Sequence, residues 1–176
     1  MDPIWLVVMG VSGCGKSSLG AALAAGFALP LIEGDDFHPA SNTEKMRAGI
    51  ALTDADRAGW LDALADELAR RQDGAVLTCS ALKRAYRDRL RAAVPSLGFV
   101  FMAIEPAAAQ ARVAARARAH IFPASLVASQ FATLEVPVGE AGVLAVPAIE
   151  PLERLVAEVR AWVHRPAADP PAAGNA

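Results

Sequence analysis

A glycine-rich segment, Gly10-Val-Ser-Gly-Cys-Gly-Lys-Ser17, directly follows the apolar run 4–9. The spacing Gly-x-x-x-x-Gly-Lys-Ser is typical of a phosphate-binding loop, whose glycines let backbone N–H groups point at phosphate oxygens. In such a loop Lys16 neutralises the β- and γ-phosphates and the Ser17 hydroxyl can bind Mg²⁺, while a helix beginning near Gly15 adds its positive dipole end. The motif predicts a nucleoside triphosphate site made by Gly10, Ser12, Gly13, Cys14, Gly15, Lys16, Ser17 and Ser18.

Carboxylates follow the second apolar run of the chain, whereas the third run, 75–79, ends in Cys79-Ser80 without one. Glu33 and Asp35 are two residues apart, so in an extended chain their side chains share one face. One carboxylate could then serve Mg²⁺ through water, and the other could orient or deprotonate an acceptor hydroxyl, as phosphoryl transfer requires. The alternative is that the segment 34–36 only forms a turn with side-chain caps.

Polar residues that could contact a small acceptor lie in the insertion after this run. His38 precedes Pro39, and it could either contact the substrate or simply pack and cap the loop. Asn42 and Lys45 are three residues apart and could bind hydroxyl and carboxylate groups. Three-residue spacing of polar groups is equally typical of a solvated helix face.

A second group of candidate acceptor residues follows the run 75–79. Ligands of parallel α/β sheets bind beyond the carboxyl ends of the strands, which favours Ser80, Lys83 and Arg87 as substrate contacts. Lys83 and Arg87 are four residues apart and line one stripe of a helix. The alternative for this stripe is a solvated basic face.

A basic segment around residues 112–120 precedes a break between two predicted helices. Cations on a segment that closes over the phosphates would stabilise the transferring charge and exclude water. This predicts a lid at about 116–125, with Arg116 and Arg118 as catalytic cations and His120 as a substrate contact. A helix with an exposed basic stripe is the alternative.

Short apolar runs alternate with amphipathic stretches, which is typical of a parallel sheet covered by helices on both faces. The expected strands are 4–9, 29–33, 75–79, 98–104 and 143–146. The expected helices are 15–26, one that begins with a capping box at Thr53, 83–93, 106–117, 124–135 and 151–164. We expect one domain over 1–165, with the α/β fold of a three-layer αβα sandwich, and a disordered Pro- and Ala-rich tail at 166–176.

Composition limits the partners. Apolar residues make up 54% of the 176-residue chain, yet no apolar run approaches the roughly 20 residues that span a bilayer. The net charge of −2 argues against nucleic acid as a main partner. We expect a cytoplasmic protein with no membrane partner, in which Cys14 and Cys79 are reduced thiols. The Asn-Lys-x-Asp motif of a GTPase does not occur, and no Asp-x-x-Gly follows an expected strand.

The chain resembles the thermoresistant type of gluconate kinase, a P-loop kinase family related to shikimate and adenylate kinases. The resemblance covers nearly the whole chain except the tail, and the segments 79–83 and 129–135 together are highly specific. The matching segments are 9–17, Glu33-Gly-Asp35 with His38-Pro39, 42–46, 52–57 with Trp60-Leu61, Cys79-Ser-Ala-Leu-Lys83 with 86–88, and Ser129-Gln-Phe-Ala-Thr-Leu-Glu135 with Pro137.

This resemblance implies a five-stranded parallel sheet with a helical acceptor-binding insertion and a lid. It implies transfer of the γ-phosphate of ATP to the 6-hydroxyl of D-gluconate, with Mg²⁺ as cofactor, in a homodimer that feeds the pentose phosphate or Entner–Doudoroff pathway. By similarity to shikimate kinases, Glu33 would support Mg²⁺ and Asp35 would meet the acceptor hydroxyl. The lid lacks the usual glycine, which leaves open whether Arg116 or Arg118 contacts the phosphates. A kinase of another sugar acid or shikimate-like metabolite, or an inactive nucleotide-binding homologue, is the alternative.

Overall fold

The computed structural model describes residues 3–116 and 125–165. In chain order, the elements are β1 (Ile4–Met9), α1 (Lys16–Phe27), β2 (Leu31–Glu33), the 3₁₀ turn η1 (Gly34–Phe37), α2 (Ala40–Arg47), α3 (Asp54–Arg70), β3 (Gly74–Thr78), α4 (Arg84–Ala93), β4 (Gly98–Ala103), α5 (Pro106–Ala115), α6 (Ser125–Thr133), β5 (Val143–Pro147) and α7 (Leu152–Val163). Among the described residues, no helix is long and apolar enough to cross a membrane.

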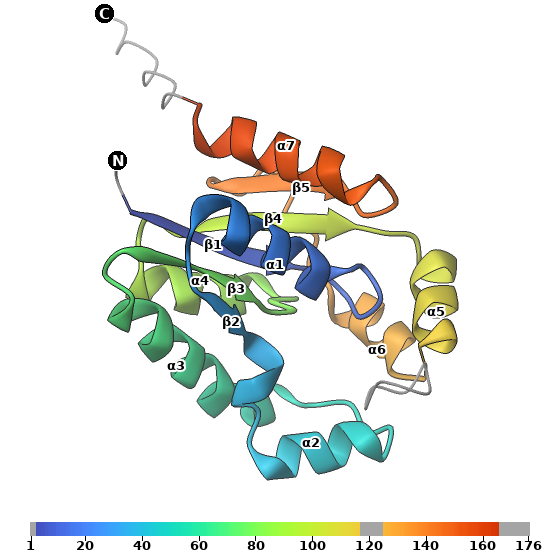
Figure 1. Cartoon of the computed structure of the whole chain (residues 1–176). Helices are drawn as coiled ribbons and strands as arrows, with labels where there is room; N and C mark the ends of the chain where they lie inside the picture. The colour runs from blue at the N-terminus through green and yellow to red at the C-terminus, as the bar shows by residue number, and fades with distance from the viewer. Residues whose placement is uncertain (1–2, 117–124, 166–176) are drawn as a thin grey trace, which may run out of the picture.

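The strands form one parallel sheet in the order β2-β3-β1-β4-β5 (Figure 1). The five predicted strands and the α/β class are confirmed. The second strand begins at Leu31 rather than at residue 29, where Pro30 has no N–H for the ladder and instead accepts a hydrogen bond from Val76 N.

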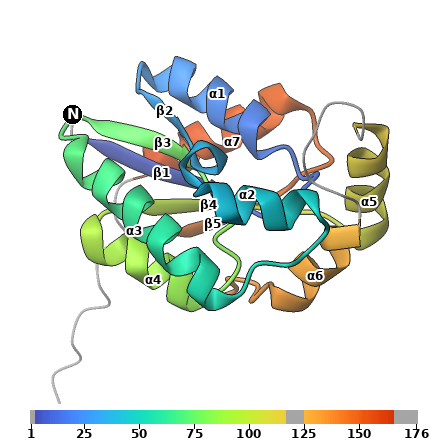
Figure 2. The ribbon, with the colours of Figure 1, turned by 90° about the horizontal axis from the view of Figure 1, so that it is seen from below.

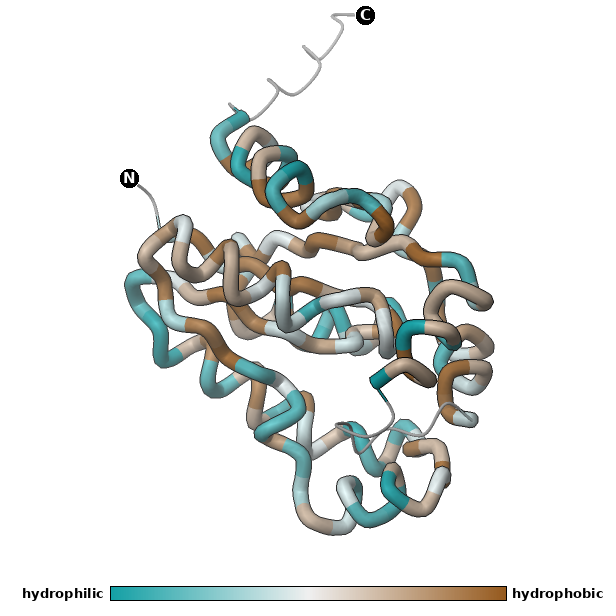
Figure 3. The backbone as a smooth tube through the Cα atoms, turned by 45° about the vertical axis from the view of Figure 1, so that its right-hand side comes forward, coloured by the Kyte–Doolittle hydropathy of each residue, from teal (hydrophilic) through white to brown (hydrophobic). Residues whose placement is uncertain are grey.

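Helices cover both faces of the sheet, because alternate residues of β1 point to opposite sides (Figure 2). Leu6 and Val8 pack with residues of α1 and α7. Val7 and Met9 pack with residues of α3 and α4. The buried central strands are therefore almost wholly apolar, whereas the covering helices mix hydrophobic and hydrophilic residues (Figure 3).

The segments that carry polar motifs gather beyond the carboxyl ends of the strands. Helices α5 and α6 lie together at the end to which β4 points, and α2 lies on the same side of the molecule below β2 (Figure 1). A small apolar cluster that includes Val11, Leu82, Val113 and Val127 joins the phosphate-binding loop to α5 and α6. The fold thus brings segments from five parts of the chain to one edge.

Candidate active site

The segment after β1 has the conformation of a phosphate-binding loop. Gly15 has a φ of 100° and caps α1, which begins at Lys16. Gly13 has a φ of 86°, and a Cβ atom there would lie only 2.7 Å from the carbonyl oxygen of Ala109. These positions need glycine because the left-handed backbone and the tight packing both disfavour a side chain. The Lys16 ammonium donates a hydrogen bond to Val11 O at 3.1 Å.

A cavity at this loop has the size and lining expected for the nucleotide phosphates. Its walls include most of the predicted nucleotide-binding residues together with a strand-end threonine and a cation that follows α5. The lining residues are Ser12, Gly13, Gly15, Lys16, Ser17, Ser18, Asp35, Thr78, Val113 and Arg116, and the volume is about 290 Å³. Gly10 and Cys14, the other two predicted nucleotide-binding residues, are buried within the loop and do not line this cavity.

The residues for a metal lie at the edge of this cavity. Ser17 Oγ donates a hydrogen bond of 3.1 Å to Glu33 Oε2, and Thr78 Oγ1 donates to the same oxygen. Hydroxyl and carboxylate oxygens suit Mg²⁺. No group of three His, Cys, Asp or Glu residues in the described part of the chain could hold a metal. The donor set therefore fits an ion that takes its other ligands from phosphate and water.

A second cavity adjoins the first and opens between η1, α3 and α6. It is lined by Ser12, Lys16, Asp35, His38, Met46, Ala51, Leu52, Arg57, Trp60, Ser80, Leu126, Ser129 and Gln130. Ser12, Lys16 and Asp35 line both cavities. The Asp35 side chain is 88% exposed, so its carboxylate is accessible to a molecule in either cavity.

His38 forms part of the wall of the second cavity. Its ring stacks on Trp60, with a centroid distance of 4.1 Å, and its Nδ1 lies 3.3 Å from Asn42 Nδ2. Burial lowers the pKa of His38, although the Asp35 carboxylate opposes this effect and Arg57 adds to it. The imidazole is therefore held in its neutral form more strongly than a free histidine.

Four of the predicted acceptor residues in the described part of the chain do not line either cavity, and three of them, Asn42, Lys45 and Lys83, contact the first turn of α3. Asn42 is buried and donates a 2.8 Å hydrogen bond to Asp56 O. Lys45 Nζ lies 2.6 Å from Asp56 Oδ1, and this pairing, together with hydrogen bonds from Thr53, lowers the pKa of Asp56 to about 2. Lys83 Nζ lies 2.8 Å from an oxygen of Asp54, which raises the pKa of Lys83. Both lysines are thus paired with the first turn of α3.

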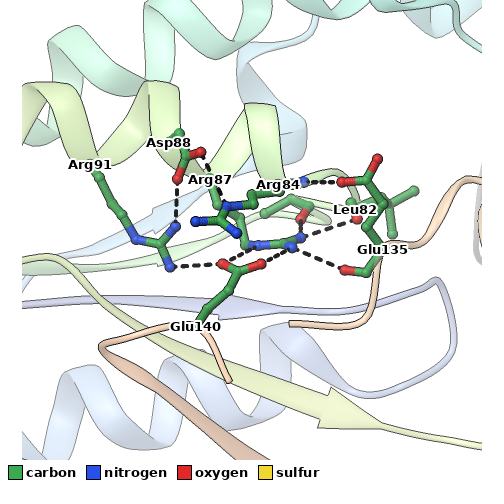
Figure 4. Close-up of polar contacts among 8 residues, drawn as sticks. Leu82, Arg84, Arg87, Asp88, Arg91, Glu135 and Glu140 are labelled. Atoms are coloured by element: carbon green, nitrogen blue, oxygen red, sulfur yellow. Dashed lines mark hydrogen bonds and ion pairs between the residues drawn. The ribbon is translucent and has the colours of Figure 1, made fainter. Parts of the chain in front are cut away.

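The structure corrects the prediction that Arg87 contacts the substrate. Its side chain is fully buried and pairs with Glu140, and its other donors bind the carbonyl oxygens of Ala81, Leu82 and Glu135 (Figure 4). The stripe of α4 that carries Arg87 faces the segment after α6 rather than solvent. Because the guanidinium already has acceptors, Arg87 does not reach the substrate cavity.

Arg57 is a cavity residue that the sequence reasoning missed. It is only 9% exposed, its Nη1 donates to Leu52 O, and its guanidinium lies 5.8 Å from the Tyr86 ring centroid. No carboxylate among the described residues forms an ion pair with it. A signal was present in the sequence, because residue 57 lies on the same helical stripe as Trp60, Leu61 and Leu64. An unpaired cation on an apolar stripe indicates an anionic ligand.

The structure describes only the two ends of the predicted lid at about 116–125. Arg116 follows α5 and lines the nucleotide cavity, whereas Arg118 and His120 lie outside the described residues. Arg112, on the last turn of α5, donates hydrogen bonds of 3.4 Å to Gly13 O and Cys14 O and one of 3.1 Å to Ala148 O. It ties the phosphate-binding loop to the segment after β5.

The two cysteines are buried free thiols. Burial raises the pKa of Cys79 to about 12. A thiol that stays protonated at neutral pH is a poor nucleophile. Cys79 therefore fills space at the end of β3 and takes no chemical part in the site.

Comparison with known proteins agrees with this geometry. A family model described as an AAA domain matches residues 6–137. A gluconokinase of Gluconobacter oxydans is 48% identical over 78% of each chain, and the thermoresistant gluconokinase of Escherichia coli is 39% identical over 86% of this chain and 88% of its own. The crystal structure of a gluconokinase from Sinorhizobium meliloti is 47% identical, covers 90% of each chain and superposes with a TM-score of 0.83. The chain belongs to the gluconokinase family of P-loop kinases.

Proposed function

We propose that this protein is a gluconokinase that transfers the γ-phosphate of ATP to the 6-hydroxyl of D-gluconate, giving 6-phosphogluconate and ADP. The observation that carries the proposal is that Lys16 and Asp35 line both the nucleotide cavity and the adjoining polar cavity. A donor phosphate and an acceptor hydroxyl can therefore meet between one cation and one carboxylate. Phosphoryl transfer needs this positioning more than it needs covalent chemistry.

The residues of the site divide the work between donor and acceptor. Lys16 and the backbone N–H groups of the loop hold the β- and γ-phosphates, and Ser17 with Glu33 holds Mg²⁺, which neutralises charge on the phosphates when bound. Asp35 accepts the hydroxyl proton as the acceptor oxygen bonds to the γ-phosphorus and ADP leaves with the bridging oxygen. Arg116 lines the nucleotide cavity and stabilises the charge during transfer.

Arg57 supports a sugar acid as the acceptor. A buried guanidinium without a carboxylate partner among the described residues is costly unless a ligand pairs with it. A planar carboxylate accepts two parallel hydrogen bonds from a guanidinium, which gives orientation as well as binding energy. The carboxylate of gluconate would then lie at Arg57 and its far hydroxyl at Asp35, with His38 and Ser80 along the wall.

Other parts of the proposal rest on the family and on the residue types. Arg118 and His120 close over the site together with Arg116, in a lid at about 116–125. Asn42, Lys45 and Lys83 support acceptor binding by holding the first turn of α3, the helix that carries Arg57. We propose a cytoplasmic homodimer that uses ATP and Mg²⁺ and supplies 6-phosphogluconate to the pentose phosphate or Entner–Doudoroff pathway.

A coupled assay of ADP release over a panel of sugar acids and shikimate tests the proposal. We expect Mg²⁺-dependent turnover with D-gluconate and the highest kcat/KM for this acceptor. A higher kcat/KM for a different acid would show that this acid, and not D-gluconate, is the acceptor of the enzyme. Normal ATP binding without transfer to any member of the panel would indicate a catalytically inactive homologue.

A further inference from the structure

Gln130 of α6 connects two walls of the acceptor cavity that lie far apart in the sequence. The backbone N–H of Ser12, in the phosphate-binding loop, donates a 2.6 Å hydrogen bond to Gln130 Oε1. Both residues line the acceptor cavity, and Ser12 also lines the nucleotide cavity. The Gln130 amide therefore lies one hydrogen bond from the wall that donor and acceptor share.

The orientation of this amide follows from its partner. A backbone N–H can only donate, so the atom that faces Ser12 is the carbonyl oxygen of the side chain. The Nε2 group then carries two N–H donors at the cavity wall. No oxygen of the described residues accepts a hydrogen bond from Nε2, and the side chain is half-buried. These donors are left for a ligand.

The backbone around Gln130 is held firmly. Leu134 N donates to Gln130 O at 2.9 Å, and Glu135 N donates to Leu82 O at 2.8 Å. Glu135 Oε2 accepts a 2.7 Å hydrogen bond from Arg84 N at the start of α4 (Figure 4). The end of α6 is thus fastened to the segment that follows Ser80, and the hydrogen bond from Ser12 N orients the Gln130 amide itself.

We infer that Gln130 reads the hydroxyl next to the one that is phosphorylated, by donating from Nε2 to the 5-hydroxyl of gluconate. This inference rests on the proposed function, with the carboxylate at Arg57 and the 6-hydroxyl at Asp35. Gln130 lies at the phosphate end of the cavity, because it is bonded to Ser12. The 5-hydroxyl is the acceptor oxygen nearest to the reacting one, and a site built to donate to a hydroxyl disfavours a substrate that leaves the donor unpaired.

The test uses two sugar acids that differ from D-gluconate at a single carbon. L-Idonate has the opposite configuration at carbon 5, and D-galactonate has it at carbon 4. We expect the wild-type enzyme to prefer D-gluconate over L-idonate by at least about tenfold in kcat/KM. In Gln130→Leu this ratio should fall to within about threefold, whereas the ratio of D-gluconate to D-galactonate should change by less than about twofold.

Two further variants distinguish a role of Gln130 in recognising the acceptor from a role in holding the phosphate-binding loop. Gln130→Glu keeps an oxygen for Ser12 N–H and loses the donor, so it should lose the carbon-5 preference as Gln130→Leu does. Gln110→Leu, an exposed glutamine on α5, is the matched control and should keep the wild-type ratios. The affinity for ADP, measured by titration, reports on the phosphate-binding loop.

Each outcome has a separate meaning. A wild-type enzyme that uses D-gluconate normally but does not distinguish L-idonate, or a Gln130→Leu enzyme that keeps the distinction, would overturn the inference alone. A uniform loss with every acceptor, together with weaker ADP binding, would also overturn it in favour of support of the loop. A wild-type enzyme inactive on D-gluconate would overturn the proposed function and this inference together.

Discussion

Lys45 Nζ lies 2.6 Å from Asp56 Oδ1, and this pair occupies the only polar group that the Lys45 side chain has. One residue further along α3, Arg57 reaches the acceptor cavity without a carboxylate partner among the described residues. Lys45 is therefore neutralised by the protein, whereas Arg57 is open to a ligand. An acceptor that carries a carboxylate fits this division.

Arg57→Met is expected to raise the KM for gluconate by about tenfold or more, because a charged hydrogen-bonding partner of the carboxylate is lost. The penalty should be absent for sorbitol, which has no carboxylate. Steady-state kinetics with both acceptors measure this difference. Arg47→Met, an exposed arginine on α2, is the control. An equal loss with both acceptors would contradict the assignment of the carboxylate to Arg57.

Asp35→Asn is expected to lower kcat by about 10²–10⁴-fold, because the amide cannot accept the hydroxyl proton. The affinity for ATP should stay within about threefold of the wild type, since the phosphates are held by the loop. Single-turnover kinetics and nucleotide titration measure the two effects. Asp36→Asn changes the neighbouring exposed carboxylate, which lines neither cavity, and should leave kcat unchanged. Near-normal turnover by Asp35→Asn would exclude Asp35 as the proton acceptor.

Protonation of His38 should reduce the stability of the fold. Because burial lowers its pKa from 6.5, the unfolded chain binds a proton more readily than the folded one. This contribution to the free energy of unfolding is complete above pH 6.5 and is lost as the pH falls through the lowered pKa. Urea unfolding between about pH 5 and 8 measures the slope, which should be shallower in His38→Gln. Identical slopes for the two proteins would rule out His38 as the source.

Glu140→Gln is expected to lower the free energy of unfolding by about 3 kcal/mol, because it leaves the buried Arg87 guanidinium without its counter-charge. Chemical denaturation measures the change. The control is Asp62→Asn, which breaks an exposed pair with Arg89 and should cost no more than about 1 kcal/mol. An equal loss of unfolding free energy in the two variants would show that burial does not make the Arg87–Glu140 pair more important for stability.

The two lid cations can be compared directly. Arg116→Ala should lower kcat by about 10²-fold or more, because Arg116 lines the nucleotide cavity. A parallel measurement on Arg118→Ala shows whether the second arginine shares this work. A kcat unchanged in Arg116→Ala but strongly reduced in Arg118→Ala would assign the phosphate contact to Arg118.

Local patterns made the sheet and the phosphate-binding loop predictable. Each β-strand is a short apolar run, and the loop motif specifies its own backbone through Gly13 and Gly15. The end of α6 was less predictable, because the helix was expected to run to residue 135 but ends at Thr133. Glu135 N there donates to Leu82 O, a contact that no periodicity reveals.

The sequence by itself determined the donor half of the site, since residues 10–17 act together through adjacent backbone groups. Only the tertiary structure decided which side chains face the acceptor. It buried Arg87 against Glu140, paired Lys45 with Asp56, and brought Gln130 to Ser12 across 118 positions of the chain. Spacing predicts which residues share a face of one helix, but the partner of that face depends on how distant elements pack.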